Sequence, residues 1–137
     1  MKRCTKCKKK KSFDQFGRRS KSKDRHNSWC FGCTRLGMNK RYATDPLRRA
    51  AIRRATALQI AKNKETVRHY LRCHPCVDCT EPDDCVLEFD HVTGEKSGNI
   101  SRMVRTGTST ETLLVEIAKC EVRCANCHRR KTRHTLW

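Results

Sequence analysis

Paired cysteines constrain the fold of this chain more than any other feature. Its 137 residues contain 11 cysteines, and most fall into CxxC pairs at positions 4 and 7, 30 and 33, 73 to 79, and 124 and 127. Two such pairs supply the four thiolates of a tetrahedral zinc site. Disulfides are the alternative use of cysteine, but an odd number of cysteines fits them poorly. We therefore expect zinc to hold the fold.

The composition agrees with a fold that needs metal. Hydrophobic residues make up 36% of the chain and aromatic residues 6%, which is little for one small domain or two very small ones. The N-terminus, MKRCTKCKKKK, is basic but lacks the apolar segment of a secretory signal. We expect a reducing, cytoplasmic setting, such as a bacterial cell or a phage-infected host.

The positive charge lies almost entirely in one half of the chain. Residues 1–72 contain 23 Lys and Arg against 4 Asp and Glu, whereas residues 73–137 contain 9 against 10. A polycation of this kind attracts phosphate backbones. An anionic membrane is the rival partner, but it requires bulky apolar anchors where this chain has mostly alanine. The charge pattern therefore favours a nucleic acid and not a membrane.

The basic half divides into two predicted segments. Residues 1–43 are expected to form a four-cysteine zinc module whose ligands are Cys4, Cys7, Cys30 and Cys33. Residues 44–72 are predicted to form a long helix, with Thr44 or Asp45 as the N-cap and Pro46 in its first turn. Free or disulfide-bonded thiols are the alternative for the module.

The long helix has two interpretations. It is either a solvated surface helix that links two modules, or a linker that also lies along a nucleic-acid backbone. We favour the second, because its charge has one sign. The arginines that we expect to contact phosphates are Arg48, Arg49, Arg53 and Arg54.

Residues 73–137 are predicted to form the second zinc-stabilised module. Its first CxxC pair is ambiguous, because Cys76 has a cysteine three residues away on either side. We choose Cys76 with Cys79, since this pair follows a proline in a knuckle-like turn, and join it to the later pair, Cys124 and Cys127. The other three, Cys73, Cys85 and Cys120, are expected to be buried free thiols.

The elements expected in this module are two strands and two helices. Strands are predicted at 85–92 and 121–123, and the second leads into a final helix that begins near Cys127. Between them, Thr108 and Glu111 form a capping box. The helix that follows is expected to place Leu113, Leu114 and Ile117 on one face.

Three polar residues in this module suggest chemistry. Asp90 and His91 end the first strand, and His128 directly follows Cys127, so closing the zinc site draws His128 towards the strand end. Asp90 and His128 can ligate one divalent ion and leave positions for water and a phosphate oxygen. His91 suits a general base at neutral pH. Neighbours in a strand point to opposite faces, so this arrangement requires the strand to bend as it ends.

The motif CVDC…LEFDHV…CANCHRRK resembles the HNH nucleases, also called His-Me finger or ββα-metal nucleases, and especially the zinc-bound branch that includes phage recombination endonuclease VII. The resemblance covers about residues 73–133. It implies a small α+β fold, His91 as general base, Asp90 and His128 on catalytic Mg²⁺ or Mn²⁺, and two structural zinc ions. It also implies double-stranded DNA as partner and no small-molecule substrate. Independently of the resemblance, Arg129, Arg130 and Lys131 follow on the last helix, where they could hold flanking phosphates.

One departure from the family is clear. HNH proteins usually have an asparagine shortly before the second CxxC pair, where this chain has Lys119. Asn99 and Asn126 are candidate substitutes at other spacings. The alternative function is a zinc protein that binds nucleic acid without cleaving it. Residues 1–72 fit both functions, and only Asp90, His91 and His128 separate them.

Overall fold

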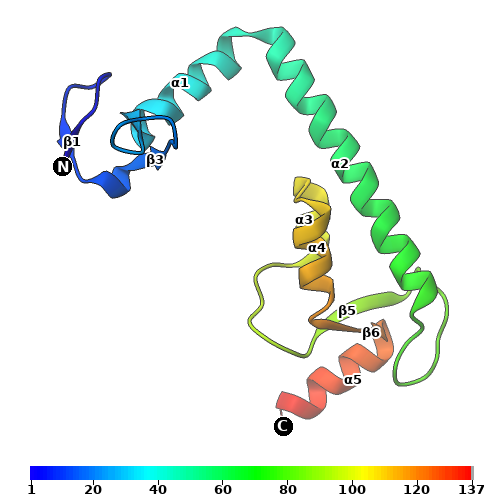
Figure 1. Ribbon diagram of the computed structural model, residues 1–137. Coiled ribbons are helices and arrows are strands. Elements are labelled where there is room, and N and C mark those ends of the chain that lie inside the picture. Colours follow the sequence, from blue (N-terminus) through cyan, green and yellow to red (C-terminus); the bar gives the residue numbers. More distant parts are fainter. Residues whose placement is uncertain (137) are drawn as a thin grey trace. The chain divides into compact units, whose positions relative to one another are not determined.

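The computed structural model describes the backbone of residues 1–136 and the side chains of residues 1–133. The chain forms two compact units, Met1–Ile52 and Arg53–Trp137. The predicted domain limits were residues 43 and 72, whereas the units divide once, inside the long helix α2 (Pro46–Cys73) that Figure 1 labels. Within the described residues, no helix is long and apolar enough to cross a membrane.

The first unit consists of short strands and one helix. Its elements are β1 (Lys2–Arg3), β2 (Lys10–Lys11), a 3₁₀ turn (Phe13–Gln15), β3 (Phe16–Arg18), β4 (His26–Cys30) and α1 (Phe31–Thr44). Strand β1 pairs with β2, and β3 pairs with β4, both antiparallel. The core consists of Phe16 and the cysteine side chains around it, and α1 contributes no buried residue. The cysteines therefore form most of the interior.

The second unit combines an antiparallel hairpin with helices. Strand β5 (Leu87–His91) pairs with β6 (Cys120–Cys124), so that His91 lies opposite Cys120 and Leu87 lies opposite Cys124. The connection between the strands contains α3 (Ile100–Thr106) and α4 (Thr110–Ile117). Helix α5 (Ala125–Leu136) follows β6 directly. The sequence correctly predicted the hairpin and the last helix, but α3 was not predicted.

Two apolar clusters fill this unit. One contains Leu71, Leu87 and Val122 together with three cysteines, and the other contains Ile100, Val104, Leu113 and Ile117. Val67, Tyr70 and Phe89 pack against both clusters. The C-terminal part of α2 is therefore a component of the core of this unit.

A buried amide anchors α2 to the turn before α4. The Asn63 side chain is 0% exposed and donates a hydrogen bond of 2.7 Å to the backbone oxygen of Thr108. Its Oδ1 accepts hydrogen bonds from Gln59 and from the Thr110 hydroxyl. Because each of these polar groups has a partner, their burial is tolerated and the position of α2 along this unit is fixed.

Three local predictions were wrong. Ser109, not Thr108, caps α4, because the Ser109 hydroxyl accepts the Thr112 amide hydrogen. Leu113 and Ile117 are buried, but Leu114 is 43% exposed, since it lies on the next position around the helix. Cys73 and Cys85 are exposed, and Cys120 is partly buried.

Candidate active site and metal centres

Each unit contains one four-cysteine cluster, and in each cluster the sulfur atoms lie within 4.8 Å of one another. The Cys4 and Cys33 sulfurs are 3.8 Å apart, and the Cys79 and Cys124 sulfurs are 3.7 Å apart. These distances exclude a disulfide, whose sulfurs are about 2.05 Å apart. They equal the edge of a tetrahedron with metal–sulfur bonds of about 2.3 Å, which is about 3.8 Å. Both clusters could therefore hold a structural metal ion such as zinc, and the choice of Cys76 with Cys79 is confirmed.

The two clusters use the same turn. Each first pair is followed by a residue in the left-handed conformation, Lys8 (φ 61°) or Thr80 (φ 60°). The amide of that residue donates a 2.9 Å hydrogen bond to the carbonyl of the first cysteine, Cys4 or Cys76. Each second pair lies where a strand passes into a helix. The backbone thus directs four sulfurs to one point in both units.

Hydrogen bonds to sulfur favour the thiolate form of at least one cysteine in each cluster. Burial alone raises the pKa of Cys4 and Cys76, but backbone N–H groups directed at the sulfur outweigh it. The pKa of each of these two thiols is lowered to about 6. A thiolate is the form that binds metal, so these cysteines are ready to bind it at neutral pH.

The second unit also brings His128 to the acidic face of β5. His128 lies in the first turn of α5, and its Nε2 is 3.6 Å from Asp90 Oδ1. On the other side of the ring, Nδ1 donates a 2.7 Å hydrogen bond to Glu88 Oε2. Glu88 and Asp90 share this face because side chains two residues apart in a strand point the same way.

This arrangement suits a divalent ion between Asp90 and His128. The Glu88 carboxylate accepts the Nδ1 hydrogen, which leaves the lone pair on Nε2 facing Asp90. Neighbouring ligands of an octahedral Mg²⁺ lie about 3 Å apart, so the 3.6 Å gap needs only a small rotation of either side chain. Two protein ligands are few, but Mg²⁺ sites commonly include water and substrate phosphate.

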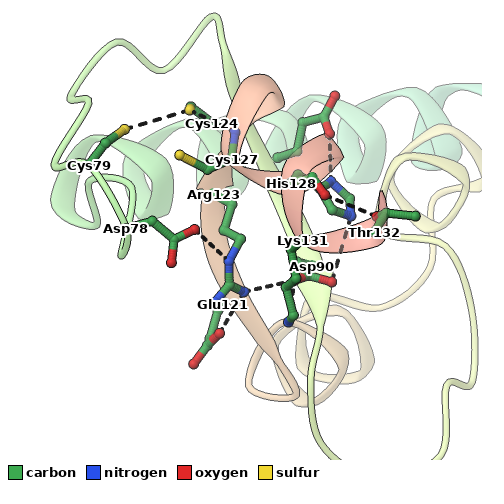
Figure 2. A network of polar contacts seen from close by, with 11 residues as sticks. Asp78, Cys79, Asp90, Glu121, Arg123, Cys124, Cys127, His128, Lys131 and Thr132 are labelled. Atoms are coloured by element: carbon green, nitrogen blue, oxygen red, sulfur yellow. Dashed lines mark hydrogen bonds and ion pairs between the residues drawn. The ribbon is translucent and has the colours of Figure 1, made fainter. Parts of the chain in front are cut away.

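Two cations already contact Asp90, as Figure 2 shows. Arg123 and Lys131 each donate a 2.7 Å hydrogen bond to Asp90 Oδ2. Burial acts to raise the pKa of the Asp90 carboxyl, but the cations of Lys131 and Arg123 hold it below its usual value. Arg123 also bonds Asp78, which lies inside the Cys76–Cys79 knuckle, and Glu121. It thereby joins the metal-binding turn to the face that carries Asp90.

His91 points to the opposite face of the hairpin. Strand β5 continues its regular pairing through Asp90 and His91, so the bend that the sequence argument required is absent from β5. The His91 Nε2 lies 3.0 Å from Oε1 of Glu116, at the end of α4. A bend in β5 therefore does not bring His91 to the side of Asp90 and His128.

A groove of about 810 Å³ runs along β5. Its lining comes from α2, residues 84–85, β5, α3 and the segment between β5 and α3, together with His128. The hairpin has two strands, and side chains from both faces of β5 line the groove, so it follows the unpaired edge of β5. His91 and His128 both line it. Its basic lining residues are Lys64, Arg68, Lys96 and Arg105.

The residues predicted to bind nucleic acid lie on two helices. Arg129 and Arg130 are exposed on α5, whereas Lys131 pairs with Asp90. On α2, Arg48 and Arg49 belong to the first unit, and Arg53 and Arg54 to the second. Of these four, Arg49 is partly buried and the others are exposed.

Three polar residues of this site were missed from the sequence, and two of them had a signal. Glu88 precedes Asp90 by two residues in a strand, which places it on the same face. Glu116 lies between Leu113 and Ile117 on the buried side of a helix, an unusual place for an acid. Arg123 directly precedes Cys124 in β6, yet is only 8% exposed.

No family model, no curated protein and no solved structure matches the sequence.

Proposed function

We propose that this protein is a metal-dependent endonuclease of the HNH type that hydrolyses phosphodiester bonds in double-stranded DNA. The main support is the approach of His128 Nε2 to Asp90 Oδ1, at 3.6 Å, beside a groove that is also lined by His91. A protein that only binds nucleic acid has no need of a pair of metal ligands beside a groove that also carries a candidate base.

Each residue has a distinct role in this proposal. Asp90 and His128 hold Mg²⁺ or Mn²⁺, with Glu88 fixing the ring of His128. His91 takes a proton from the attacking water. An ion held there would supply stabilisation of the charge that develops on the phosphate and on the leaving 3′ oxygen. The four basic side chains of the groove contact flanking phosphates, which position the strand.

Both four-cysteine clusters hold zinc in this proposal, so the protein should contain two zinc ions per chain. The first unit and the arginines of α2 supply affinity for DNA, because their charge is almost entirely positive.

A nucleic-acid-binding zinc protein without catalysis is the second candidate. The observation that favours it is the pairing of Asp90 with Arg123 and Lys131, since these cations already neutralise the carboxylate that a metal ion needs. The two functions differ in one measurable respect, which is the cleavage of DNA in the presence of a divalent ion.

A supercoiled-plasmid assay separates them. With Mg²⁺ or Mn²⁺, the purified protein should nick or linearise the plasmid, and EDTA should stop it. His91→Ala should lower the cleavage rate by about 100-fold or more, because general base catalysis is lost. DNA affinity, measured by gel shift, should stay within about twofold, since the groove keeps its basic side chains.

His69→Ala is the matched control, because His69 is exposed on the same unit and is not among the residues that line the groove. Its cleavage rate should equal that of the wild type. Wild-type rates in the His91→Ala protein would rule out the proposed base. Absence of cleavage in every divalent ion, with DNA binding intact, would favour the second candidate.

A second prediction concerns Glu88. Glu88→Gln should raise the Mg²⁺ concentration needed for half-maximal cleavage by about 10- to 100-fold. The glutamine side chain is uncharged, so it binds the Nδ1 hydrogen of His128 more weakly than the Glu88 carboxylate does. The rate at saturating Mg²⁺ should change much less. Glu111→Gln, at an exposed position on α4, should leave the Mg²⁺ requirement as it is. An unchanged requirement in Glu88→Gln would separate Glu88 from the metal site.

A further inference from the structure

Glu116 is a charged side chain that the fold buries, and the roles proposed above do not use it. It is 1% exposed, although α4 is a short helix at the surface of a small unit. Burying a carboxylate is costly unless it accepts several hydrogen bonds. Its position therefore requires partners that compensate the burial.

The Glu116 carboxylate accepts hydrogen bonds from three parts of the unit. Oε1 accepts hydrogen bonds from Nε2 of His91 at 3.0 Å and from the backbone amides of Ser97 at 2.9 Å and Gly98 at 3.2 Å. Oε2 accepts one from the Lys119 ammonium at 2.8 Å. One carboxylate thus joins the proposed base to the segment that follows it and to the start of β6.

Lys119 also forms hydrogen bonds of its own with residues 92–97. Its ammonium also donates to the backbone oxygen of Glu95 at 2.9 Å and to the Ser97 hydroxyl at 3.0 Å. Its backbone oxygen accepts the amide hydrogens of Val92 at 3.0 Å and Thr93 at 3.2 Å. The chain after His91 is therefore tied to Lys119 and Glu116 by both backbone and side-chain atoms.

Glu116 stays ionised in this setting. The hydrogen bond from Lys119 is the main cause, and with those from Gly98, His91 and Ser97 it outweighs burial and lowers the pKa of the Glu116 carboxyl to about 2. An ionised carboxylate has no hydrogen to give, so the hydrogen in its contact with His91 lies on Nε2 of the ring.

We infer that Glu116, held by Lys119, is a positioning residue that fixes His91 in the tautomer with its hydrogen on Nε2 and its lone pair on Nδ1. Nδ1 is then the atom that accepts the proton of the attacking water. The same carboxylate orders residues 92–98, which border the groove through Lys96. The inference rests on the nuclease function proposed above and assigns a role to a residue outside the metal ligands and the base.

Glu116→Gln tests it with little change in shape. In the wild type, His91 and Lys119 each donate to a different oxygen of the Glu116 carboxylate. A glutamine has only one side-chain oxygen, so its NH₂ group must face either His91 or Lys119. We expect kcat to fall by about 10- to 100-fold with KM and DNA affinity within about twofold. Combined with His91→Ala, the substitution should cause no additional loss, because its effect acts through His91.

A spectroscopic readout tests the same point without any cleavage assay. Long-range ¹H–¹⁵N spectra of the zinc-loaded protein should show His91 with its hydrogen on Nε2 in the wild type and a mixture of tautomers in Glu116→Gln. Glu111→Gln, on the same helix but exposed, should match the wild type in both spectrum and kcat.

The outcomes are distinguishable. A wild-type His91 that carries its hydrogen on Nδ1, or a Glu116→Gln protein with unchanged kcat and unchanged tautomer, would overturn the inference. If the wild type does not cleave DNA, the proposed function fails, and the spectra still decide whether Glu116 fixes the ring. If Glu116→Gln does not fold, the tautomer of the wild type and slow exchange of the Ser97 and Gly98 amides decide it.

Discussion

Replacing Cys127 with serine is expected to unfold the unit Arg53–Trp137 and to lower the zinc content from two ions per chain to one. A serine hydroxyl does not ionise at neutral pH, so the cluster loses a ligand. Structural zinc contributes about 10–16 kcal/mol in zinc-finger peptides. Whole domains are stable by only about 5–15 kcal/mol, so the loss of the ion is comparable to the entire stability of this unit.

The core of the unit explains why apolar packing does not replace the ion. Half of its first apolar cluster consists of cysteine side chains, Cys76, Cys124 and Cys127. Without metal, these sulfurs are no longer held together by bonds to a shared ion. The turn that contains Cys76 is then no longer joined to the end of β6. We expect the β5–β6 hairpin and the His128 site to be lost together.

Circular dichroism melts, amide exchange of β5 and β6, and zinc analysis measure this effect. Cys73→Ser is the matched control, because Cys73 is exposed at the end of α2 and lies outside both clusters. The first unit should stay folded in both variants, since its four ligands all come from Met1–Ile52. A cooperative melt of the second unit at the wild-type temperature in Cys127→Ser would contradict the prediction.

Local patterns in the sequence predicted the metal clusters and the hairpin well. The two cysteines of a CxxC pair lie in one turn of the backbone, so their sulfurs are close together regardless of the rest of the fold. The spacing of the pairs therefore predicted both clusters. The antiparallel strands around Asp90 and Val122 were also predicted, because in each of them apolar and charged residues alternate.

Burial and capping in the connection between the strands were less predictable. Thr108, Ser109 and Thr110 are three consecutive residues that can cap a helix, and the hydroxyl that does so depends on where Asn63 holds the turn. Asn63 is distant in sequence, so no local rule selects Ser109. Helix α3 was missed although Asn99 caps it and Gly107 ends it in the left-handed conformation, because it is only seven residues long.

The orientation of His91 depends on contacts between distant residues. Its partner Glu116 is 25 residues away in the chain, and the two side chains meet only once α4 packs on the hairpin. The candidate asparagine Asn99 caps α3 instead, and Lys119, at the position where an asparagine was expected, contacts Glu116 and the backbone of Glu95. Sequence spacing gave the candidate residues, whereas the folded chain determines which of them meet.

Asp90→Asn is expected to lower the cleavage rate by about 10⁴-fold and to weaken Mn²⁺ binding in the same protein. A divalent ion supplies several kcal/mol of charge stabilisation in the transition state, and each 1.4 kcal/mol corresponds to about tenfold in rate. The asparagine oxygen can still accept a hydrogen bond from Arg123 or Lys131, so the fold should keep its stability. Without the negative charge, however, the pair with His128 holds a divalent ion poorly.

Glu121→Gln is the matched control for this change. Glu121 also pairs with Arg123, so both substitutions remove one carboxylate charge from the same guanidinium, but only Asp90 is paired with His128. The control should keep wild-type cleavage and Mn²⁺ binding, measured by electron paramagnetic resonance and by plasmid nicking, and both proteins should retain their zinc. If the two variants lose activity equally, the defect lies in the position of Arg123 and not in the metal. If Asp90→Asn cleaves at the wild-type rate, Asp90 is a structural partner of Arg123 and Lys131, and the catalytic ion must bind elsewhere.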